Sequence, residues 1–288
     1  MIKITKQILK KIYPPRPKEA KKYDFGLLLV IGGSDFYSGS PALSALAAFR
    51  AGVDMVRIIA PKRAADIIAS FSPDLAAYPL DEKWLTKKSV STLLAMTESA
   101  KAVSYGKIAV VIGGGLGRSR ETQEAIREYL SQIDVPAVID ADAIHAVGQN
   151  QQIITGKNFL FTPHSYEFFV LTGRRVDKLS EAEKIKAVEE EAGRLKTTIL
   201  LKGPVDIISN GQETAIDRAG SPYMTVGGCG DTLAGICGAL LARGVNVFEA
   251  AQAGIYINDR AGERAANKLK EGLMATDLIE AIPEVIKN

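Results

Sequence analysis

The stretch TVGGCGDTLAG, from Thr225 to Gly235, joins three glycines and one aspartate to the start of an apolar helical pattern. Glycine loses more conformational freedom on folding than other residues, so this density indicates positive φ angles or the close approach of a ligand. Apolar side chains recur at helical spacing from Leu233 to Leu241, and Gly244 ends the pattern. The motif is therefore predicted to open a buried helix.

The aspartate in this motif, Asp231, needs a separate explanation. The N–H groups of a glycine-rich turn, aligned with the dipole of the helix that follows, form a site suited to phosphate. A carboxylate beside that site would repel phosphate unless it had another task, such as taking a proton from an attacking hydroxyl group. A helix N-cap is the alternative, and this residue alone does not decide between them.

Outside this motif, short apolar runs alternate with helical patterns, which predicts an α/β fold with a central, largely parallel sheet. The expected strands are Phe25–Ile31, Val53–Ile59, Ile108–Ile112, Val135–Ile139, Asn158–Thr162 and Thr198–Lys202. A helix is expected at Pro41–Ala51 with Ser40 as its N-cap, and another between Ser180 and Leu195. No repeat of 20 to 50 residues recurs, so a solenoid is not expected.

Composition limits the class of protein. The chain has 288 residues, is 47% hydrophobic and carries a net charge of +3. No apolar run reaches the roughly 18 residues that cross a bilayer, and the N-terminus lacks a signal peptide pattern. We expect one domain over residues 1–288 with an N-terminal arm at 1–22, whose basic stretch Lys10–Lys22 indicates a solvated arm or entry segment, no membrane or nucleic-acid partner, and a cytoplasmic location. Cys229 and Cys237 match no disulfide framework or metal spacing, and indicate a loop residue and a core residue.

Two further glycine clusters each follow a predicted strand and lead into a helix. They are IGGSDFYSGSP at Ile31–Pro41 and IGGGLGRSRET at Ile112–Thr122. Open α/β sheets bind their ligands at such strand ends. Neither cluster fits the dinucleotide fingerprint or the P-loop, so ordinary Rossmann and Walker folds are disfavoured. Each loop alone could also be a plain strand-to-helix turn.

Titratable residues follow three other predicted strands. Asp140 and Asp142 are spaced so that an extended backbone would point both to one side, for a metal or a proton, or else to cap the next helix. His164 and Glu167 could touch substrate and metal-bound water, with a helix start capped by Ser165 as the alternative. Lys202 ends a strand, where it could face a nucleotide or solvent, and His145 is expected on a helix surface.

The ordered set of motifs resembles a known family. GGSDFYSGSPALSALAAFRAG, GGGLGRS, VIDADAIH, TPHSYEF, LLKGPVDII and GGCGDTLAGI resemble the ADP/ATP-dependent NAD(P)H-hydrate dehydratases of the ribokinase-like superfamily, over roughly Tyr23 to Ile279. The resemblance implies a three-layer sandwich with a central, largely parallel sheet flanked by helices. Three residues depart from the usual pattern, namely Ser40, Gly114 and Cys229, and none removes a polar group that the chemistry needs.

The resemblance implies a repair reaction. The enzyme would convert the S-epimer of hydrated NADH or NADPH (NADHX or NADPHX) back to NADH or NADPH. ADP or ATP would phosphorylate the ring hydroxyl group, giving AMP or ADP, and the phosphorylated intermediate would then lose phosphate. Mg²⁺ is expected as a cofactor, because phosphoryl transfer from a nucleotide makes a divalent metal necessary in most such enzymes.

The resemblance also implies roles for individual residues. Asp231 would be the base, with amides around Gly228 and Gly230 stabilising the transferred phosphoryl group. The hydrate pocket would be lined by Ser40, Pro41, Ala42, Gly115 and His164, together with Asp231. The nucleotide would be held by Lys202, Gly203, Pro204, Val205, Asp206 and Gly230. Asp140, Asn158 and Glu167 would bind Mg²⁺ or its waters, by analogy with related kinases.

Several partners and alternatives follow from the same resemblance. We expect a homotetramer or larger homo-oligomer and a functional link to an NAD(P)H-hydrate epimerase. The preference for ADP or ATP and for NADHX or NADPHX stays open. The first alternative is a small-molecule kinase of the same superfamily, acting on a hydroxymethylpyrimidine, a hydroxyethylthiazole or a sugar. The second is a nucleotide-binding regulator without catalysis.

Overall fold

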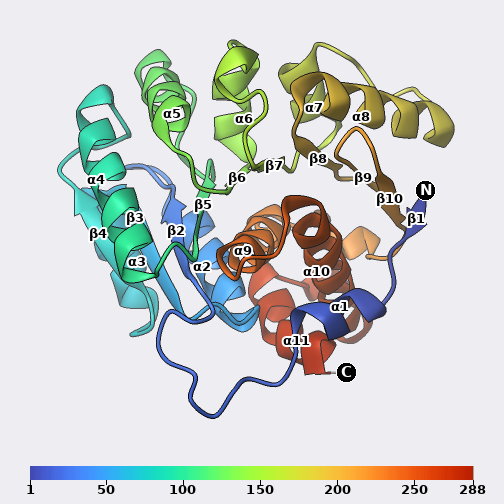
Figure 1. The fold of residues 1–288 in the computed structure, drawn as a ribbon, viewed down its shortest axis with the longest axis horizontal. Helices are drawn as coiled ribbons and strands as arrows, with labels where there is room; N and C mark the ends of the chain where they lie inside the picture. The colour runs from blue at the N-terminus through green and yellow to red at the C-terminus, as the bar shows by residue number, and fades with distance from the viewer. Residues whose placement is uncertain (288) are drawn as a thin grey trace.

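The fold was obtained as a computed structural model, which describes residues 1–287. Its centre is a ten-stranded sheet in the order β1-β10-β9-β8-β7-β6-β5-β2-β3-β4 (Figure 1). All strands run in one direction except β9, which is antiparallel to both of its neighbours. The strands are β1 (Ile2–Lys3), β2 (Leu27–Ile31), β3 (Met55–Pro61), β4 (Ala76–Leu80), β5 (Ile108–Ile112), β6 (Ala137–Ile139), β7 (Phe159–Phe161), β8 (Thr198–Leu201), β9 (Asp206–Ser209) and β10 (Thr214–Asp217).

Helices cover both faces of this sheet, which confirms the predicted sandwich (Figure 1). They are α1 (Gln7–Ile12), α2 (Gly39–Arg50), α3 (Lys62–Phe71), α4 (Lys87–Val103), α5 (Arg120–Gln132), α6 (Ala141–Gly148), α7 (Ser165–Thr172), α8 (Glu181–Leu195), α9 (Cys229–Ala242), α10 (Val247–Leu269) and α11 (Ala275–Lys287). Short 3-10 turns lie at Gln151–Ile153, Pro222–Thr225 and Lys270–Gly272. No helix among residues 1–287 has both the length and the apolar character needed to cross a membrane.

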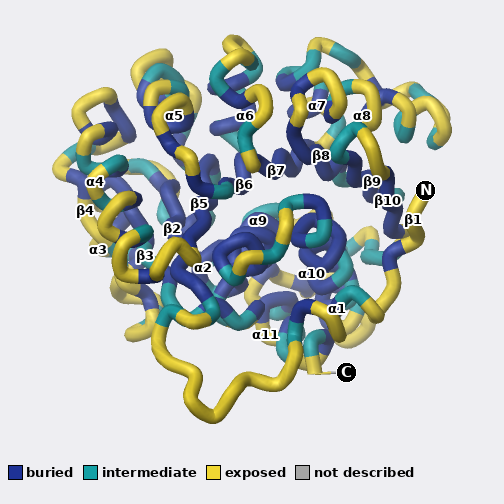
Figure 2. Tube along the Cα trace, in the orientation of Figure 1, coloured by how far each residue is buried: buried dark blue, intermediate teal, exposed yellow. Residues whose placement is uncertain are grey.

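The two cores arise from the alternation of side chains along buried strands. In β2, Leu28 and Val30 face the cluster built with α2, α9, α10 and α11. Leu27, Leu29 and Ile31 face the opposite cluster, built with α4 to α8. Successive side chains of a strand point to opposite faces, so a strand covered on both sides is apolar throughout. Figure 2 shows the resulting buried sheet between two helical layers with exposed outer surfaces.

The predicted element boundaries are correct to within a few residues. Helix α2 begins at Gly39, before the expected start at Pro41. The capping box of Ser180 and Glu183 at the head of α8 is confirmed. Gly244 follows α9 with φ of 89°, a conformation that L residues rarely adopt, and so ends the helix as predicted.

Part of the N-terminal arm, residues 1–22, packs against the rest of the chain, and the basic stretch expected as a solvated arm or entry segment, Lys10–Lys22, begins inside a helix. Strand β1 pairs with β10, and α1 buries Leu9 and Ile12 against the core. The sequence pattern missed these elements because two paired residues and a six-residue helix are too short to show periodicity. Residues 14–22 are exposed, as predicted for a solvated segment.

Strand order determines where the site lies. Strands β3 and β4 extend to one side of β2, whereas β5, β6, β7 and β8 extend to the other. The connections that leave the carboxyl ends of β2 and β5 therefore run to opposite sides of the sheet. Open α/β sheets bind ligands at such a switch point. The two glycine-rich loops expected at Ile31–Pro41 and Ile112–Thr122 are the loops at this switch point.

Candidate active site

The glycine-rich loops after β2 and β5 meet the start of α9. The Gly33 N–H donates to the Gly114 carbonyl at 2.8 Å, which joins the two loops. A Cβ atom on Gly114 would lie 2.8 Å from Asp231 Oδ1 and 2.8 Å from the Ser40 Cβ. Pro41 and Ala42 are buried in the first turn of α2, directly behind Ser40. The structure thus brings Ser40 and Asp231 together across the Gly114 backbone.

The start of α9 rejects the N-cap alternative for Asp231. Gly228 is the N-cap with φ of 101°, and the helix begins at Cys229, so Cys229 is a helical residue rather than a loop residue. Asp231 is the third residue of the helix, and its backbone carbonyl accepts a hydrogen bond from Ser44 Oγ at 2.9 Å. First-turn N–H groups have no partner within their own helix, so this end of α9 offers donors and a positive dipole to an anion.

The environment of the Asp231 carboxyl raises its pKa to about 7. Burial is the main cause, and the negative charge of Asp140 adds to it. A hydrogen bond from Ser40 and the positive charge of Lys202 act in the opposite direction. A carboxyl group with a pKa near neutrality can accept a proton and release it again under physiological conditions.

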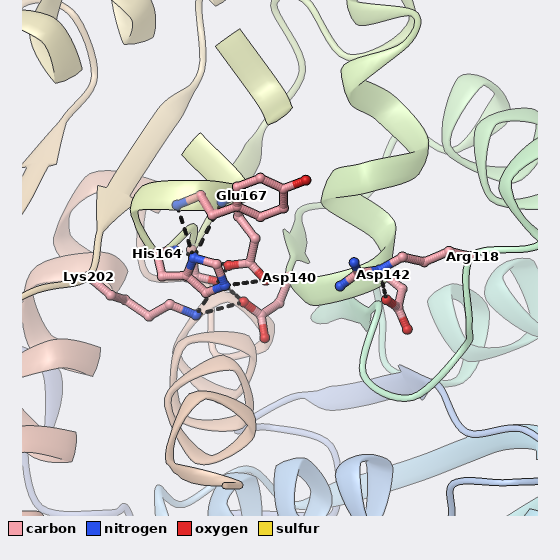
Figure 3. A network of polar contacts seen from close by, with 8 residues as sticks. Arg118, Asp140, Asp142, His164, Glu167 and Lys202 are labelled. Carbon is pink, nitrogen blue, oxygen red and sulfur yellow. Dashed lines mark hydrogen bonds and ion pairs between the residues drawn. The ribbon is translucent and has the colours of Figure 1, made fainter. Parts of the chain in front are cut away.

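A partly buried lysine, Lys202, contacts two other predicted site residues, Asp140 and Glu167 (Figure 3). Lys202 Nζ donates to Asp140 Oδ1 at 3.1 Å and lies 3.9 Å from Glu167 Oε2. Thr162, which the sequence analysis missed, donates to the same Asp140 oxygen at 2.8 Å. Burial would lower the pKa of Lys202, but the two carboxylates outweigh it and raise that pKa overall. Burial raises the pKa of Glu167, and Lys202 opposes that shift.

His164 has a structural function in addition to its place near the site. It is the N-cap of α7, where its Nδ1 accepts hydrogen bonds from the N–H groups of Tyr166 and Glu167 at 3.1 and 3.3 Å. Glu167 accepts in return from the His164 N–H at 2.9 Å, which completes a capping box. The cap is therefore His164, not Ser165 as the alternative had it. About half of the His164 side chain is exposed, so the ring can still meet a ligand.

Asp140 and Asp142 do not act as a pair, contrary to the expectation from their spacing. Ala141 between them has φ of 46°, so the backbone is not extended there. Asp142 turns to the β5–α5 loop, where it accepts from the Gly117 N–H at 2.8 Å and from Arg118 Nε at 2.7 Å. Figure 3 shows the two aspartates in separate groups. Asp142 fixes the glycine-rich loop instead of sharing a ligand with Asp140.

Asn158 lies away from the other residues expected to bind metal. It is exposed and precedes β7, and its carbonyl accepts from the N–H of Ala137 at the start of β6. Asp140 and His164 follow the carboxyl ends of these parallel strands, so Asn158 is at the opposite edge of the sheet. Among residues 1–287, no three histidine, cysteine, aspartate or glutamate side chains gather as a metal-binding group.

The residues expected to hold the nucleotide lie on the turn from β8 to β9. The Gly203 N–H donates to Asp206 Oδ1 at 3.0 Å, which fixes this turn. A Cβ atom on Gly230 would lie 3.5 Å from Lys202 Nζ, so the turn reaches the start of α9. The turn residues Gly203 and Pro204 are exposed and accessible to a ligand.

Behind this turn, Asp206 pairs with a second carboxyl group, that of Asp259, which no sequence motif indicated. Asp206 and Asp259 of α10 are both buried, and burial raises their pKa values to about 6 and about 10. The charge of Asp206 also raises the pKa of Asp259, which therefore holds a proton at neutral pH. Because 53 residues of sequence separate the two, only the tertiary structure reveals their contact.

His145 also differs from its predicted role as a surface residue. It lies on α6, partly buried, and its Nε2 atom has no hydrogen-bond partner within the described chain. Burial, followed by the charge of Arg118, lowers its pKa. Its neighbour Arg118 belongs to the β5–α5 loop, and this contact gives no signal in the sequence.

Comparison with known proteins identifies the family. The sequence model of the NAD(P)H-hydrate dehydratase family matches residues 28–284. An ADP-dependent (S)-NAD(P)H-hydrate dehydratase of Nitrosopumilus maritimus is 36% identical over 284 residues, covering 99% of this chain and 96% of the relative. A bifunctional NAD(P)H-hydrate repair enzyme, Nnr, of Pyrobaculum aerophilum is 41% identical over 274 residues, 94% of this chain. The chain spans only 52% of that relative's length.

Solved structures agree in fold. The ADP/ATP-dependent NAD(P)H-hydrate dehydratase of Bacillus subtilis, co-crystallised with ATP and Mg²⁺, has a TM-score of 0.79 at 24% identity, covering 98% of this chain and 96% of its own. A ribokinase-like protein of Enterococcus faecalis has a TM-score of 0.84 at 24% identity, covering 99% and 95%. These likenesses confirm the ribokinase-like fold. With the family match over most of its length, the chain belongs to the NAD(P)H-hydrate dehydratase family.

Proposed function

We propose that this protein is an ADP-dependent dehydratase that restores NADH or NADPH from the S-epimer of its hydrate. The observation that carries the proposal is the Asp231 carboxyl, with a pKa of about 7, at the N-terminus of α9 between two glycine-rich loops. Its support is the family match and the near full-length likeness to a relative that bears the name of this activity.

The first step needs a base and an anion site next to each other. Asp231 would take the proton from the C6 hydroxyl group of the hydrate, whose oxygen then attacks the terminal phosphorus of ADP. The bond from that phosphorus to the bridging oxygen breaks, and AMP leaves. Free N–H groups at Gly228–Gly230 would stabilise the charge on the transferred phosphoryl group.

The second step needs no further group from the nucleotide. The lone pair of the ring nitrogen expels phosphate from C6, and loss of a proton from C5 restores the dihydropyridine ring. Hydroxide is a poor leaving group at neutral pH, whereas phosphate leaves readily, so the nucleotide makes the dehydration possible. Ser40, Pro41, Ala42, Gly115 and His164 would line the pocket in which the ring is held.

The nucleotide would lie along the turn from Lys202 to Asp206, with its terminal phosphate toward Gly230. Lys202 is suited to a phosphate, because its side chain is partly buried and its ammonium group adjoins the start of α9. Mg²⁺ binds through one or two carboxylates plus substrate phosphates, and Asp140 and Glu167 provide such carboxylates beside Lys202. We propose that these two residues hold a magnesium ion that arrives with the nucleotide, where it would neutralise phosphate charge.

The test is the absorbance at 340 nm of hydrated NADH mixed with the protein, Mg²⁺ and either ADP or ATP. A nucleotide-dependent rise with the wild-type protein is expected. Asp231→Asn should lower the rate about 100- to 10,000-fold, because general base catalysis contributes factors of that size. Asp134→Asn is the matched control, since Asp134 lies between α5 and β6, at the opposite edge of the sheet, where its exposed side chain pairs with Lys101.

The principal alternative is a small-molecule kinase with the same fold. A hydroxyethylthiazole kinase of Pyrococcus horikoshii shares the fold with a TM-score of 0.62 at 16% identity, covering 98% of this chain and 95% of its own. Such a kinase would use the same aspartate and anion site. Folded wild-type protein that gives no rise with either nucleotide, but phosphorylates a pyrimidine or thiazole alcohol, would replace the dehydratase proposal. Tight nucleotide binding without any turnover would instead indicate a regulator.

Partners and surroundings remain proposals as well. We expect the protein to act with an NAD(P)H-hydrate epimerase, because a dehydratase specific for one epimer leaves the other behind. The bifunctional name of the Pyrobaculum aerophilum relative supports this pairing. A homotetrameric or larger assembly and a cytoplasmic location are predictions, which sizing chromatography and cell fractionation would test.

A further inference from the structure

Two aromatic side chains stand exposed on the loop between β2 and α2. Phe36 is 81% exposed and Tyr37 is 54% exposed. Their rings meet edge to face, with centroids 4.8 Å apart and planes at 79°. Large aromatic side chains contribute most to stability when they are buried, so two adjacent exposed rings call for another explanation.

The loop that carries these rings is held in place by its backbone. The Ser34 N–H donates to the Tyr37 carbonyl at 2.8 Å, which closes a tight turn. Arg63 donates to the Asp35 carbonyl at 2.6 Å, and the Asp35 N–H donates to the Lys83 carbonyl at 2.7 Å. Hydrogen bonds thus connect the turn to two neighbouring segments and hold the backbone that carries the two rings.

The position of the turn connects it to the site. A Cβ atom on Gly115 would lie 2.9 Å from the Tyr37 Cβ, so Tyr37 packs directly against the backbone of Gly115. The next residue in the same loop, Gly114, contacts Asp231. With consecutive Cα atoms 3.8 Å apart, the Tyr37 Cβ lies at most about 13 Å from the Asp231 carboxylate. A nicotinamide ring with its carboxamide and ribose can bridge that span.

We propose that Phe36 and Tyr37 form an aromatic platform that packs against the nicotinamide half of the dinucleotide substrate. This inference rests on the proposed function. In the hydrate, the ring nitrogen, the C2=C3 double bond and the carboxamide stay conjugated, so this part of the molecule is flat and can stack on an aromatic ring. A pyrophosphate and two riboses separate the adenine from the reacting carbon. With that carbon at Asp231, the adenine of an extended dinucleotide lies farther away than the span from the Asp231 carboxylate to Tyr37.

The position of the platform predicts which kinetic parameter should change when a ring is removed. It touches the substrate away from the C6 oxygen, so it contributes to binding before the reaction as much as during it. Loss of a ring should therefore raise the KM for the hydrate and leave kcat almost unchanged. The KM for ADP should not change, because the proposed nucleotide turn at Lys202–Asp206 is on another loop.

The experiment compares Phe36→Ala, Tyr37→Ala and Tyr37→Phe with the wild-type protein. Phe71→Ala is the matched control, because Phe71 is 54% exposed at the far end of α3. For each protein, kcat and KM are measured for the hydrate and for ADP, and Kd is measured by calorimetry for NADH and for reduced nicotinamide mononucleotide. Both alanine variants should raise the KM for the hydrate and both Kd values about five- to tenfold. In Tyr37→Phe and Phe71→Ala, the KM for the hydrate and both Kd values should stay within about twofold of the wild-type values.

The outcomes separate the platform from the proposed function. If the wild-type protein turns over the hydrate and the alanine variants have unchanged KM and Kd values, the platform alone is overturned. If the alanine variants bind NADH more weakly but bind the mononucleotide as the wild type does, the rings contact the adenine. That result would overturn the assignment to the nicotinamide half. A wild-type protein that neither turns over the hydrate nor binds NADH would overturn both the proposed function and the platform.

Discussion

Lowering the pH should stop the reaction by protonating Asp231, whose pKa burial raises to about 7. A general base must be ionised to accept a proton, so activity falls as the pH decreases through that pKa. With a pKa of about 7, roughly one molecule in ten has an ionised Asp231 at pH 6 and roughly nine in ten at pH 8. The structure thus predicts about a tenfold difference in kcat/KM between these two pH values.

Neighbouring groups allow the assignment to Asp231 to be tested. Ser40 and Lys202 both lower its pKa, so Ser40→Ala and Lys202→Met should each move the acid limb of kcat/KM to higher pH. Lys101→Met is the control, because Lys101 pairs with Asp134 on the surface at 2.7 Å. That variant should keep the wild-type profile.

The assay is the initial rise in absorbance at 340 nm at saturating ADP and low hydrate concentration, from pH 5.5 to 9. Under these conditions the limb reports the ADP-bound protein before it binds the hydrate, so its position does not depend on how a variant binds the hydrate. A profile that is flat between pH 6 and 8 would refute the assignment of the base. A limb that is unmoved by both Ser40→Ala and Lys202→Met would refute the electrostatic account.

Two stability predictions follow from buried groups. Burial raises the pKa of Asp259 to about 10, so its contribution to stability is full below about pH 4 and is lost as the pH rises toward 10. Asp259→Asn should therefore raise the melting temperature at pH 8 more than at pH 5, and an equal change at both values would contradict this. In Gly235→Ala the new Cβ would lie 2.1 Å from the Ser44 carbonyl oxygen, a clash expected to cost about 1–3 kcal/mol. Urea unfolding measures that loss, and Gly272→Ala, which meets nothing within 4 Å, should show no comparable decrease.

The fold was largely accessible from the sequence because its strands are buried on both faces. The run Ile108–Ile112 is apolar throughout, and β5 has the predicted boundaries. Strands β4, β9 and β10 were missed because each mixes apolar residues with polar or small ones. β4 exposes Ala76, Tyr78 and Pro79, so it has no continuous apolar signal.

The sequence indicated which candidate residues lie close together where a single motif fixes the backbone. It failed where contacts between segments distant in sequence determine their positions. Gly228 and Asp231 are three residues apart in one turn, so sequence distance is a good guide to spatial distance there. Asp140 and Asp142 were paired on the assumption of extended backbone, which the positive φ of Ala141 invalidates. Asn158 was grouped with the metal residues by analogy, and strand direction alone separates it from them.

The contact between α2 and α9 restricts how this molecule can move. Gly235 lets the α9 backbone approach the Ser44 carbonyl, and the Ser44 hydroxyl group holds the Asp231 carbonyl at 2.9 Å. The helix that begins beside Ser40 and the helix that carries Asp231 are thereby joined along their first turns, and no hinge lies between them. If α2 lines the hydrate pocket and Asp231 is the base, as we propose, these two parts of the site keep a constant distance from each other.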